Sequence, residues 1–215
     1  MNLSPRRPIF NRRAESSAYR VFFLALLVLG GFWLIIQLQE GRIESPFAAP
    51  PTPTRTSASL ALEGDAQFTA GDLNRAITAY QEAVRVNPDD GQSWALLSRI
   101  QTYSSALLTT DAERAARLTQ ALESARQATA VVPDDSTAHA VLAFALDWNA
   151  DPSLVDEPQV QAYLTEADTE AIRALQLDAT NTLALAFYAE ILVDQQKWTQ
   201  AEQYIKQAVS RDPSL

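Results

Sequence analysis

Few residues in this sequence could do chemistry near neutral pH. The chain has no cysteine, which excludes disulfides, thiolate nucleophiles and cysteine-bound zinc. Its single histidine, His139, is the one imidazole that could exchange a proton near pH 7. It stands at a helical position that Leu60, Trp94 and Leu185 occupy in related segments, and no pattern of partner residues accompanies it. We therefore interpret His139 as a partly buried packing residue.

The best metal-binding candidate is the segment DWNADPSLVDE, which starts at Asp147. Asp147, Asn149 and Asp151 resemble the D-x-N-x-D start of a calcium loop. The sixth position, which should be glycine, is Pro152, and the twelfth, which should be glutamate, is Pro158. Turn acids and helix caps explain these residues without a metal, and the six glycines are not grouped as in a phosphate-binding loop. The sequence therefore predicts a protein with no metal, no cofactor and no enzymatic activity.

Charge is distributed unevenly along the 215 residues. The first 20 residues carry five arginines and one acid, for a net charge of +4. From residue 57 onward there are 23 acidic and 10 basic residues, for a net charge of −13. Nucleic-acid binding needs clustered basic residues to neutralise phosphates, so the acidic body speaks against a nucleic-acid partner.

Residues 21–38, VFFLALLVLGGFWLIIQL, contain no charge and are long enough to span a membrane as a helix. Five arginines precede this run and only Arg42 and Arg55 follow it before residue 57, which predicts residues 1–20 in the cytoplasm and the rest outside. A cleavable signal peptide would have a shorter apolar core followed by small residues, whereas QLQEGRIESPFAAP follows here. A buried globular helix would need more apolar surroundings. We favour a single-pass protein of the cytoplasmic membrane.

Residues 39–56 follow the predicted transmembrane helix and are rich in Pro, Thr and Ser. Proline fixes φ and removes hydrogen-bond donors, so we expect an extended, semi-rigid linker. It would hold residues 57–215 away from the bilayer.

Residues 57–215 repeat one pattern of small residues four times. The three small positions hold Gly64, Ser98, Ala143 and Ala189; then Ala76, Ala121, Ala167 and Ala201; then Ala83, Ala128, Ala174 and Ala208. Short side chains let antiparallel helices approach closely, while large residues between them fill the gaps. A turn with Pro88, Pro133 or Pro213 closes three of the four segments, and Asp90 and Asp135 are well placed as N-caps.

This pattern resembles the tetratricopeptide repeat family. Residues 57–90 match a full 34-residue period through Gly64, Ala76, Tyr80, Ala83 and Pro88, and residues 182–215 match likewise. The resemblance implies an all-α solenoid of four helical hairpins, in residues 57–90, 91–135, 136–181 and 182–215, preceded by one transmembrane helix and a Pro-rich linker. It implies little about the ligand.

Two of the four repeats are longer than the 34-residue period. In repeat two, Thr110 and Glu113 are spaced as a capping box, so the extra residues should lengthen the hairpin. In repeat three, Asp156 and Pro158 could start a longer second helix. The two long hairpins are neighbours, so they either form one projecting ridge or pack on each other. The last helix has no polar capping helix after it and should expose an apolar face, which a partner or a further part of the protein would cover.

The resemblance also implies a concave groove lined by the first helix of each repeat. The positions expected to be exposed in the groove are Asp65, Phe68, Arg99, Tyr103, Phe144, Asp147, Trp148, Phe187, Glu190 and Asp194. Aromatic residues with a few charges are typical of interface centres, although several of these aromatics could instead fill the core between hairpins. Arg99 is the sole base among them, so the family's clamp for a C-terminal carboxylate is not expected.

We therefore expect a non-catalytic, membrane-tethered scaffold whose groove binds a basic or apolar segment of a partner protein outside the cytoplasmic membrane. Two alternatives stay open. The chain could be a permanent structural subunit of a larger membrane complex. It could also assist secretion or cytochrome maturation, because bacterial proteins of those systems combine one membrane helix with such repeats.

Overall fold

The computed structural model describes residues 17–39 and 55–213, and in these residues every regular element is an α-helix. The chain divides into two compact units, residues 1–54 and residues 55–215. The predicted basic N-terminus lies mostly, and the predicted linker almost entirely, outside the described residues, as do residues 214 and 215.

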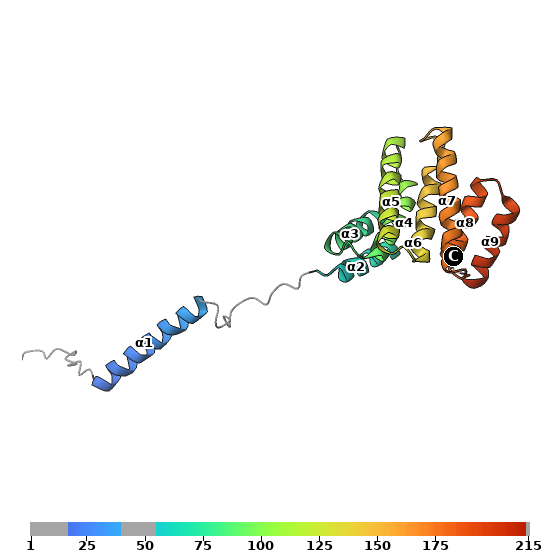
Figure 1. The fold of residues 1–215 in the computed structure, drawn as a ribbon. Helices are drawn as coiled ribbons and strands as arrows, with labels where there is room; N and C mark the ends of the chain where they lie inside the picture. Colours follow the sequence, from blue (N-terminus) through green and yellow to red (C-terminus); the bar gives the residue numbers. More distant parts are fainter. Residues whose placement is uncertain (1–16, 40–54, 214–215) are drawn as a thin grey trace, which may run out of the picture. The chain divides into compact units, whose positions relative to one another are not determined.

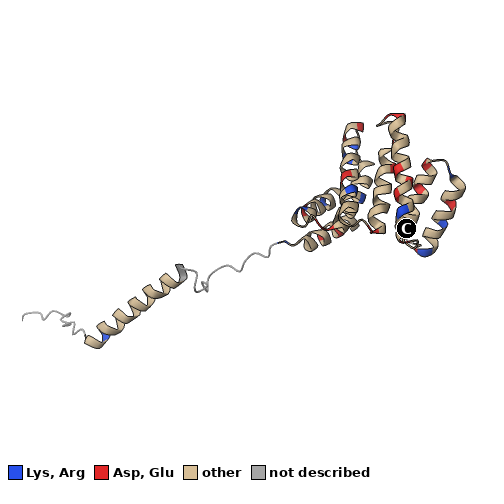
Figure 2. Cartoon of the chain, viewed as in Figure 1, with Lys and Arg blue, Asp and Glu red and all other residues tan. Residues whose placement is uncertain are grey.

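The first unit contains helix α1, Ala18–Gln39. Its only charged residue is Arg20, and the rest of the helix carries no charge in Figure 2. Residues 18–37 are long and apolar enough to cross a membrane, and their side chains are not buried. A signal sequence near the N-terminus has the same length and composition, so a membrane anchor stays a proposal.

The second unit is a stack of four helical hairpins (Figure 1). Their helices are α2 (Ser57–Thr69) and α3 (Leu73–Val86), α4 (Gly91–Ser105) and α5 (Asp111–Val131), α6 (Ser136–Asn149) and α7 (Glu157–Leu177), and α8 (Thr182–Asp194) and α9 (Trp198–Arg211). Helix α6 contacts both α4 and α8, so the first helices of hairpins two, three and four form a continuous inner layer, while the first hairpin contacts α4 through α3. The predicted all-α solenoid is confirmed.

The repeated small residues allow the two helices of each hairpin to approach closely. Alanines at the second and third small positions are 0–4% exposed in all four hairpins. At the first small position, a Cβ on Gly64 would lie 2.5 Å from the ring of Tyr80, which is itself fully buried. The buried hydroxyl of Ser98 donates to the carbonyl oxygen of Ala121 at 2.8 Å and so replaces an apolar contact by a hydrogen bond.

Side-chain caps begin the helices where the sequence predicted them. Asp90 accepts from the backbone N–H of Ser93 at 3.1 Å, and Asp135 accepts from that of Ala138 at 2.7 Å. Thr110 and Glu113 form a capping pair through the Thr110 hydroxyl, which donates to the Glu113 carboxylate at 2.7 Å. The Thr110 hydroxyl oxygen also accepts from the backbone N–H of Glu113 at 3.3 Å, so each cap satisfies an N–H group that has no partner within its helix.

The extra residues of repeats two and three lengthen the second helix of each hairpin. Helices α5 and α7 have 21 residues each, whereas the other repeat helices have 13–15. Figure 1 shows both long helices extending beyond the inner helices on the same side of the stack. Arg114, near the start of α5, bonds to Asp151 and Ser153 of the α6–α7 loop and so connects the two extensions.

Candidate functional site

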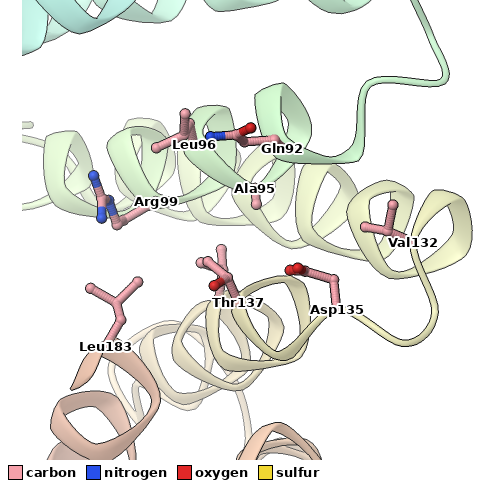
Figure 3. A pocket seen from close by; sticks show the side chains of 9 residues that line it. Gln92, Ala95, Leu96, Arg99, Val132, Asp135, Thr137 and Leu183 are labelled. Atoms are coloured by element: carbon pink, nitrogen blue, oxygen red, sulfur yellow. The ribbon is translucent and has the colours of Figure 1, made fainter. Parts of the chain in front are cut away.

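The inner helices α4, α6 and α8 carry a pocket near their N-terminal ends (Figure 3). Its volume is about 370 Å³, and its lining combines apolar, amide, hydroxyl and charged side chains: Gln92, Ala95, Leu96, Arg99, Val132, Asp135, Thr137, Val141 and Leu183. Figure 3 shows the α4 side chains lying opposite Thr137, Asp135 and Leu183. Apolar walls with a few polar groups are typical of a binding pocket, so this surface can accept an apolar side chain beside a polar one.

Arg99 is the cation of this pocket. Its guanidinium carbon lies 5.5 Å from the centre of the Phe68 ring, a distance typical of a cation–π contact. Its buried Nε has no hydrogen-bond partner, and no carboxylate of the described residues forms an ion pair with it. Both residues are half-buried, as expected for positions on the groove surface.

Four predicted groove aromatics meet across the three inner helices. Phe144 of α6 stacks on Phe187 of α8 with ring centres 4.1 Å apart, and Tyr103 and Trp148 approach the Phe144 ring edge-on at 5.3 and 5.7 Å. Phe144 and Phe187 are 1% and 5% exposed, so the expectation that both are exposed in the groove is wrong, although Phe187 still borders a pocket of the inner surface. They fill the space where α6 packs on α8, as in the alternative stated for these aromatics. Tyr103 and Trp148 are half-buried and reach the surface.

A second pocket of about 540 Å³ continues the inner surface onto α9. Tyr103, Leu183 and Phe187 line one side, and Trp198 and Ile205 of α9 line the other. Leu183 belongs to both pockets and was not among the predicted site residues. Leu183 lies in the first turn of the inner helix α8, at a position that the small-residue pattern does not use. A large apolar residue at that position is the sequence feature that could have identified it.

The C-terminal ends of α6 and α8 form an acidic pocket of about 640 Å³, to which Asp147, Trp148, Glu190 and Asp194 contribute. The indole N–H of Trp148 donates to Glu190 at 2.9 Å. Asp147 is 4% exposed, so its expected exposure in the groove is also wrong. Asp194 is exposed and Glu190 half-buried. Three carboxyl groups from two adjacent inner helices therefore converge on one pocket.

These carboxyl groups bind protons more tightly than carboxyl groups in water. Burial, followed by the nearby Asp194 and Glu190 charges, raises the pKa of Asp147 to about 8. Burial also raises the pKa of Glu190, although the Trp148 hydrogen bond opposes the change, and it raises the pKa of Asp194. At neutral pH the Asp147 carboxyl group is mostly protonated. It can then donate a hydrogen bond to the Asp194 carboxylate.

Asp65, the remaining predicted site residue, is exposed on α2. Its carboxylate accepts a 2.5 Å hydrogen bond from the hydroxyl of Tyr80 on α3. Burial and this bond raise the pKa of the Tyr80 hydroxyl. Asp65 therefore connects the two helices of the first hairpin and lies apart from the pockets on α4, α6 and α8.

The structure gives His139 a packing role. Its Nε2 lies 2.9 Å from the carbonyl oxygen of Pro133, and its Nδ1 lies 2.5 Å from the Glu170 carboxylate. Trp94, at the matching position of the preceding repeat, donates to the carbonyl oxygen of Pro88 at 2.8 Å. In both repeats, therefore, a ring nitrogen contacts the carbonyl oxygen of the closing proline, from an indole in one repeat and from an imidazole in the other. This contact is a feature of the fold.

The segment that resembles a calcium loop does not form one. Asn149 donates to the carbonyl oxygens of Leu118 and Ala145, and Asp151 pairs with Arg114 and Ser153, so neither side chain is directed to a site shared with Asp147 by these bonds. Within residues 17–39 and 55–213, no group of three or more His, Cys, Asp or Glu side chains is arranged to hold a metal ion.

Comparisons with known proteins support the helical-repeat fold. A tetratricopeptide repeat family model matches residues 62–102. TTC0263, a thermophilic protein of Thermus thermophilus with these repeats, is 18% identical, with a TM-score of 0.62 over 74% of this chain and 75% of that one. MamA 41-end from Desulfovibrio magneticus is 17% identical, with a TM-score of 0.51 over 75% and 78%. No curated protein sequence matches. These likenesses establish the tetratricopeptide-repeat fold, and the function has to be argued from the surface.

Proposed function

We propose that this chain is a non-catalytic scaffold, tethered to the cytoplasmic membrane by α1, whose tetratricopeptide-repeat groove binds a partner protein outside that membrane. The observation that carries the proposal is the surface of the inner helices, where two pockets share Leu183 and run from α4 to α9. Helical-repeat solenoids use such extended concave surfaces to bind other proteins.

The groove is suited to a peptide segment with apolar and basic residues. Tyr103, Leu183, Trp198 and Ile205 offer apolar and aromatic contacts, which supply most of the affinity at interface centres. The acidic pocket at the ends of α6 and α8 adds negative charge, and the repeat unit is acidic as a whole, which speeds the approach of basic partners.

Helix α1 and its flanks support membrane tethering. The helix has the length and composition of a membrane span, and the arginines of residues 1–20 favour a cytoplasmic N-terminus. The prolines and hydroxyl residues of segment 39–56 favour an extended connection to the repeats. In this arrangement α1 tethers the groove outside the membrane without taking part in binding.

Affinity purification of the full-length protein from native membranes in mild detergent tests the proposal. Phe144 and Phe187 are buried, so replacing them would perturb the fold. Leu183→Ser instead changes both pockets, and Leu107→Ser, at a 72% exposed site of the α4–α5 loop, is the matched control. We expect Leu183→Ser to lose substoichiometric partners that Leu107→Ser retains. Equal partner sets in both variants would contradict a binding role for the groove.

A permanent subunit role is the second candidate, and the exposed apolar face of α9 favours it. Trp198, Ile205 and Val209 form one exposed apolar stripe on this helix, 62%, 41% and 46% exposed. A stable neighbour covering this stripe would copurify stoichiometrically with both variants. The same purification therefore separates a built-in subunit from a receptor for exchanging partners.

A further inference from the structure

The apolar stripe of Trp198, Ile205 and Val209 is exposed on α9, although the same positions are covered in the other hairpins. The three side chains are 62%, 41% and 46% exposed. Counted from the second small position of each repeat, their counterparts are all buried or half-buried: Leu73, Tyr80 and Val84 on α3, Leu118, Ala125 and Thr129 on α5, and Leu164, Ala171 and Leu175 on α7. The stripe therefore belongs to a helix face that the three preceding hairpins bury.

In each of those hairpins the element that packs on this second helix is another helix. Helix α4 packs on α3, α6 on α5 and α8 on α7, so the first helix of one hairpin lies against the second helix of the hairpin before it. Tyr80 of α3, for example, forms one buried cluster with Leu97 and Ile100 of α4. The repeat itself thus shows which element fits the stripe on α9, namely an α-helix with an apolar face.

A groove between α8 and α9 offers such a helix a second wall. This groove is the pocket of about 540 Å³ described above, and apolar side chains line it from both helices: Leu183 and Val193 of α8, and Trp198 and Ile205 of α9. Val193 is itself 39% exposed and extends the apolar surface away from the stripe. Exposed apolar surfaces of this kind mark protein–protein contacts, and an amphipathic helix laid into an apolar groove is a common mode of recognition.

Charge around the groove favours a basic helix. Glu190 and Glu202 line it, and among the described residues no basic side chain does. Asp168 of α7 is the counterpart of Glu202, and it accepts a 3.3 Å hydrogen bond from the hydroxyl of Tyr188 on the incoming helix α8. The Nζ of Lys197, from the same following hairpin, lies 3.9 Å from this carboxylate. An acid at this position is therefore paired with donors from the hairpin that covers it.

We propose that the groove between α8 and α9 binds an amphipathic α-helix of the partner protein, in the position that α4, α6 and α8 take on the preceding hairpins. This inference rests on the proposed function and names the kind of segment that is bound at this end of the inner surface. The apolar face of the helix covers the stripe, and a lysine or arginine at its edge pairs with Glu202. Glu202 can accept this partner because its ion pair with Lys206 lies within α9 and both side chains are exposed, and such pairs are weak.

A second copy of this chain is less suited to the groove. Residues 57–215 carry a net charge of −13, so two copies of the repeat unit repel each other. The apolar faces of α4, α6 and α8, which fit such grooves within the stack, are already buried between hairpins. A separate protein with a basic amphipathic helix satisfies both the apolar and the charged parts of the surface.

Photo-cross-linking of the full-length protein in living cells, with mapping of the cross-linked residues, tests the inference. A photoreactive benzoylphenylalanine replaces Ile205 or Val209, which lie one turn apart on α9, and Gln207 on the opposite, polar side of the helix is the control site. Mass spectrometry then locates the residue of the captured protein that each probe reached. On a partner helix, neighbouring contacts are separated by three or four residues.

We expect products from positions 205 and 209 and none from position 207. The two cross-linked residues should lie three or four positions apart in one segment that carries a lysine or arginine, and a proline placed between them should abolish both products. Val209→Lys puts a charge into the stripe and should lower the product from position 205 at least about tenfold. Gln203→Lys makes the same charge change at an exposed polar site of α9 and should leave that product unchanged.

Cross-linking of position 205 to a second copy of this chain would overturn the inference, as would cross-linked residues without helical spacing or products that survive the proline. A probe at position 183, in the first turn of α8, separates this failure from that of the proposed function. A product from position 183 without one from position 205 would overturn this inference alone. The absence of products from both positions would contradict the proposed function as well.

Discussion

Replacement of Asp147 by asparagine should make the repeat unit more stable, and the gain should grow with pH. The side chain is buried beside Asp194 and Glu190, and burial followed by these neighbouring acids raises its pKa from 3.8 to about 8 in the folded protein. The folded state therefore keeps the proton between these values, while the unfolded chain loses it. Stability from this group is fully present below pH 3.8 and is lost as the pH rises towards 8.

The size of the effect follows from proton linkage. With one proton bound in the folded state and none in the unfolded state, the free energy of unfolding falls by about 1.4 kcal/mol per pH unit. Between about pH 5 and 7 the wild type should therefore lose about 3 kcal/mol relative to Asp147→Asn. For a unit of this size that difference corresponds to a change of about 5–10 °C in the gap between the two melting temperatures.

Thermal unfolding followed by circular dichroism at 222 nm, on full-length protein in nonionic detergent, measures this gap from pH 5 to 7. Glu190 and Asp194 titrate in both proteins, so their contributions largely cancel in the difference. Asp89→Asn removes an exposed carboxylate and should follow the wild type at every pH. A gap between Asp147→Asn and wild type that stays constant over this range would refute the argument that Asp147 is protonated by burial.

Three further changes test the fold and the topology. Gly64→Ala should destabilise the first hairpin by about 1–3 kcal/mol in urea unfolding, because its Cβ would lie 2.5 Å from the ring of Tyr80; an unchanged unfolding midpoint would contradict the close packing. Asp135→Ala should cost about 1 kcal/mol in the same assay through the lost cap of α6, and Asp135→Asn should retain most of the stability. The chain has no cysteine, so Asp89→Cys should react with a membrane-impermeant maleimide on intact cells, whereas Ser4→Cys should react only after permeabilisation; the opposite pattern would reverse the proposed topology.

The sequence was sufficient to predict the features that depend on local spacing. Small residues recur at three positions of every repeat, and they mark where two helices of a hairpin touch, because a larger side chain at these positions would collide with the facing helix. Asp90, Asp135 and Thr110 were identifiable as caps since a cap bonds to a backbone N–H only three residues away. These contacts are short-range, so the pattern of residues specifies them.

Contacts between successive inner helices could not be predicted in the same way. Whether Phe144 and Phe187 face the groove or the core depends on the rotation and offset of α6 against α8, which no repeat position records. Asp147 was expected in the open groove, yet it lies one turn after the fully buried Ala143 on the same helix face. That spacing indicated burial, although the identity of the acids opposite Asp147 required the packed structure.

Site-specific photo-cross-linking in living cells tests directly whether the groove on α4, α6, α8 and α9 contacts a partner protein. A photoreactive benzoylphenylalanine at position 183 would lie between both inner pockets, and one at position 107 would lie on the exposed α4–α5 loop. We expect position 183 to give a discrete cross-linked product containing one added protein, and position 107 to give no such product. No discrete product from position 183, or the same product from both positions, would contradict it.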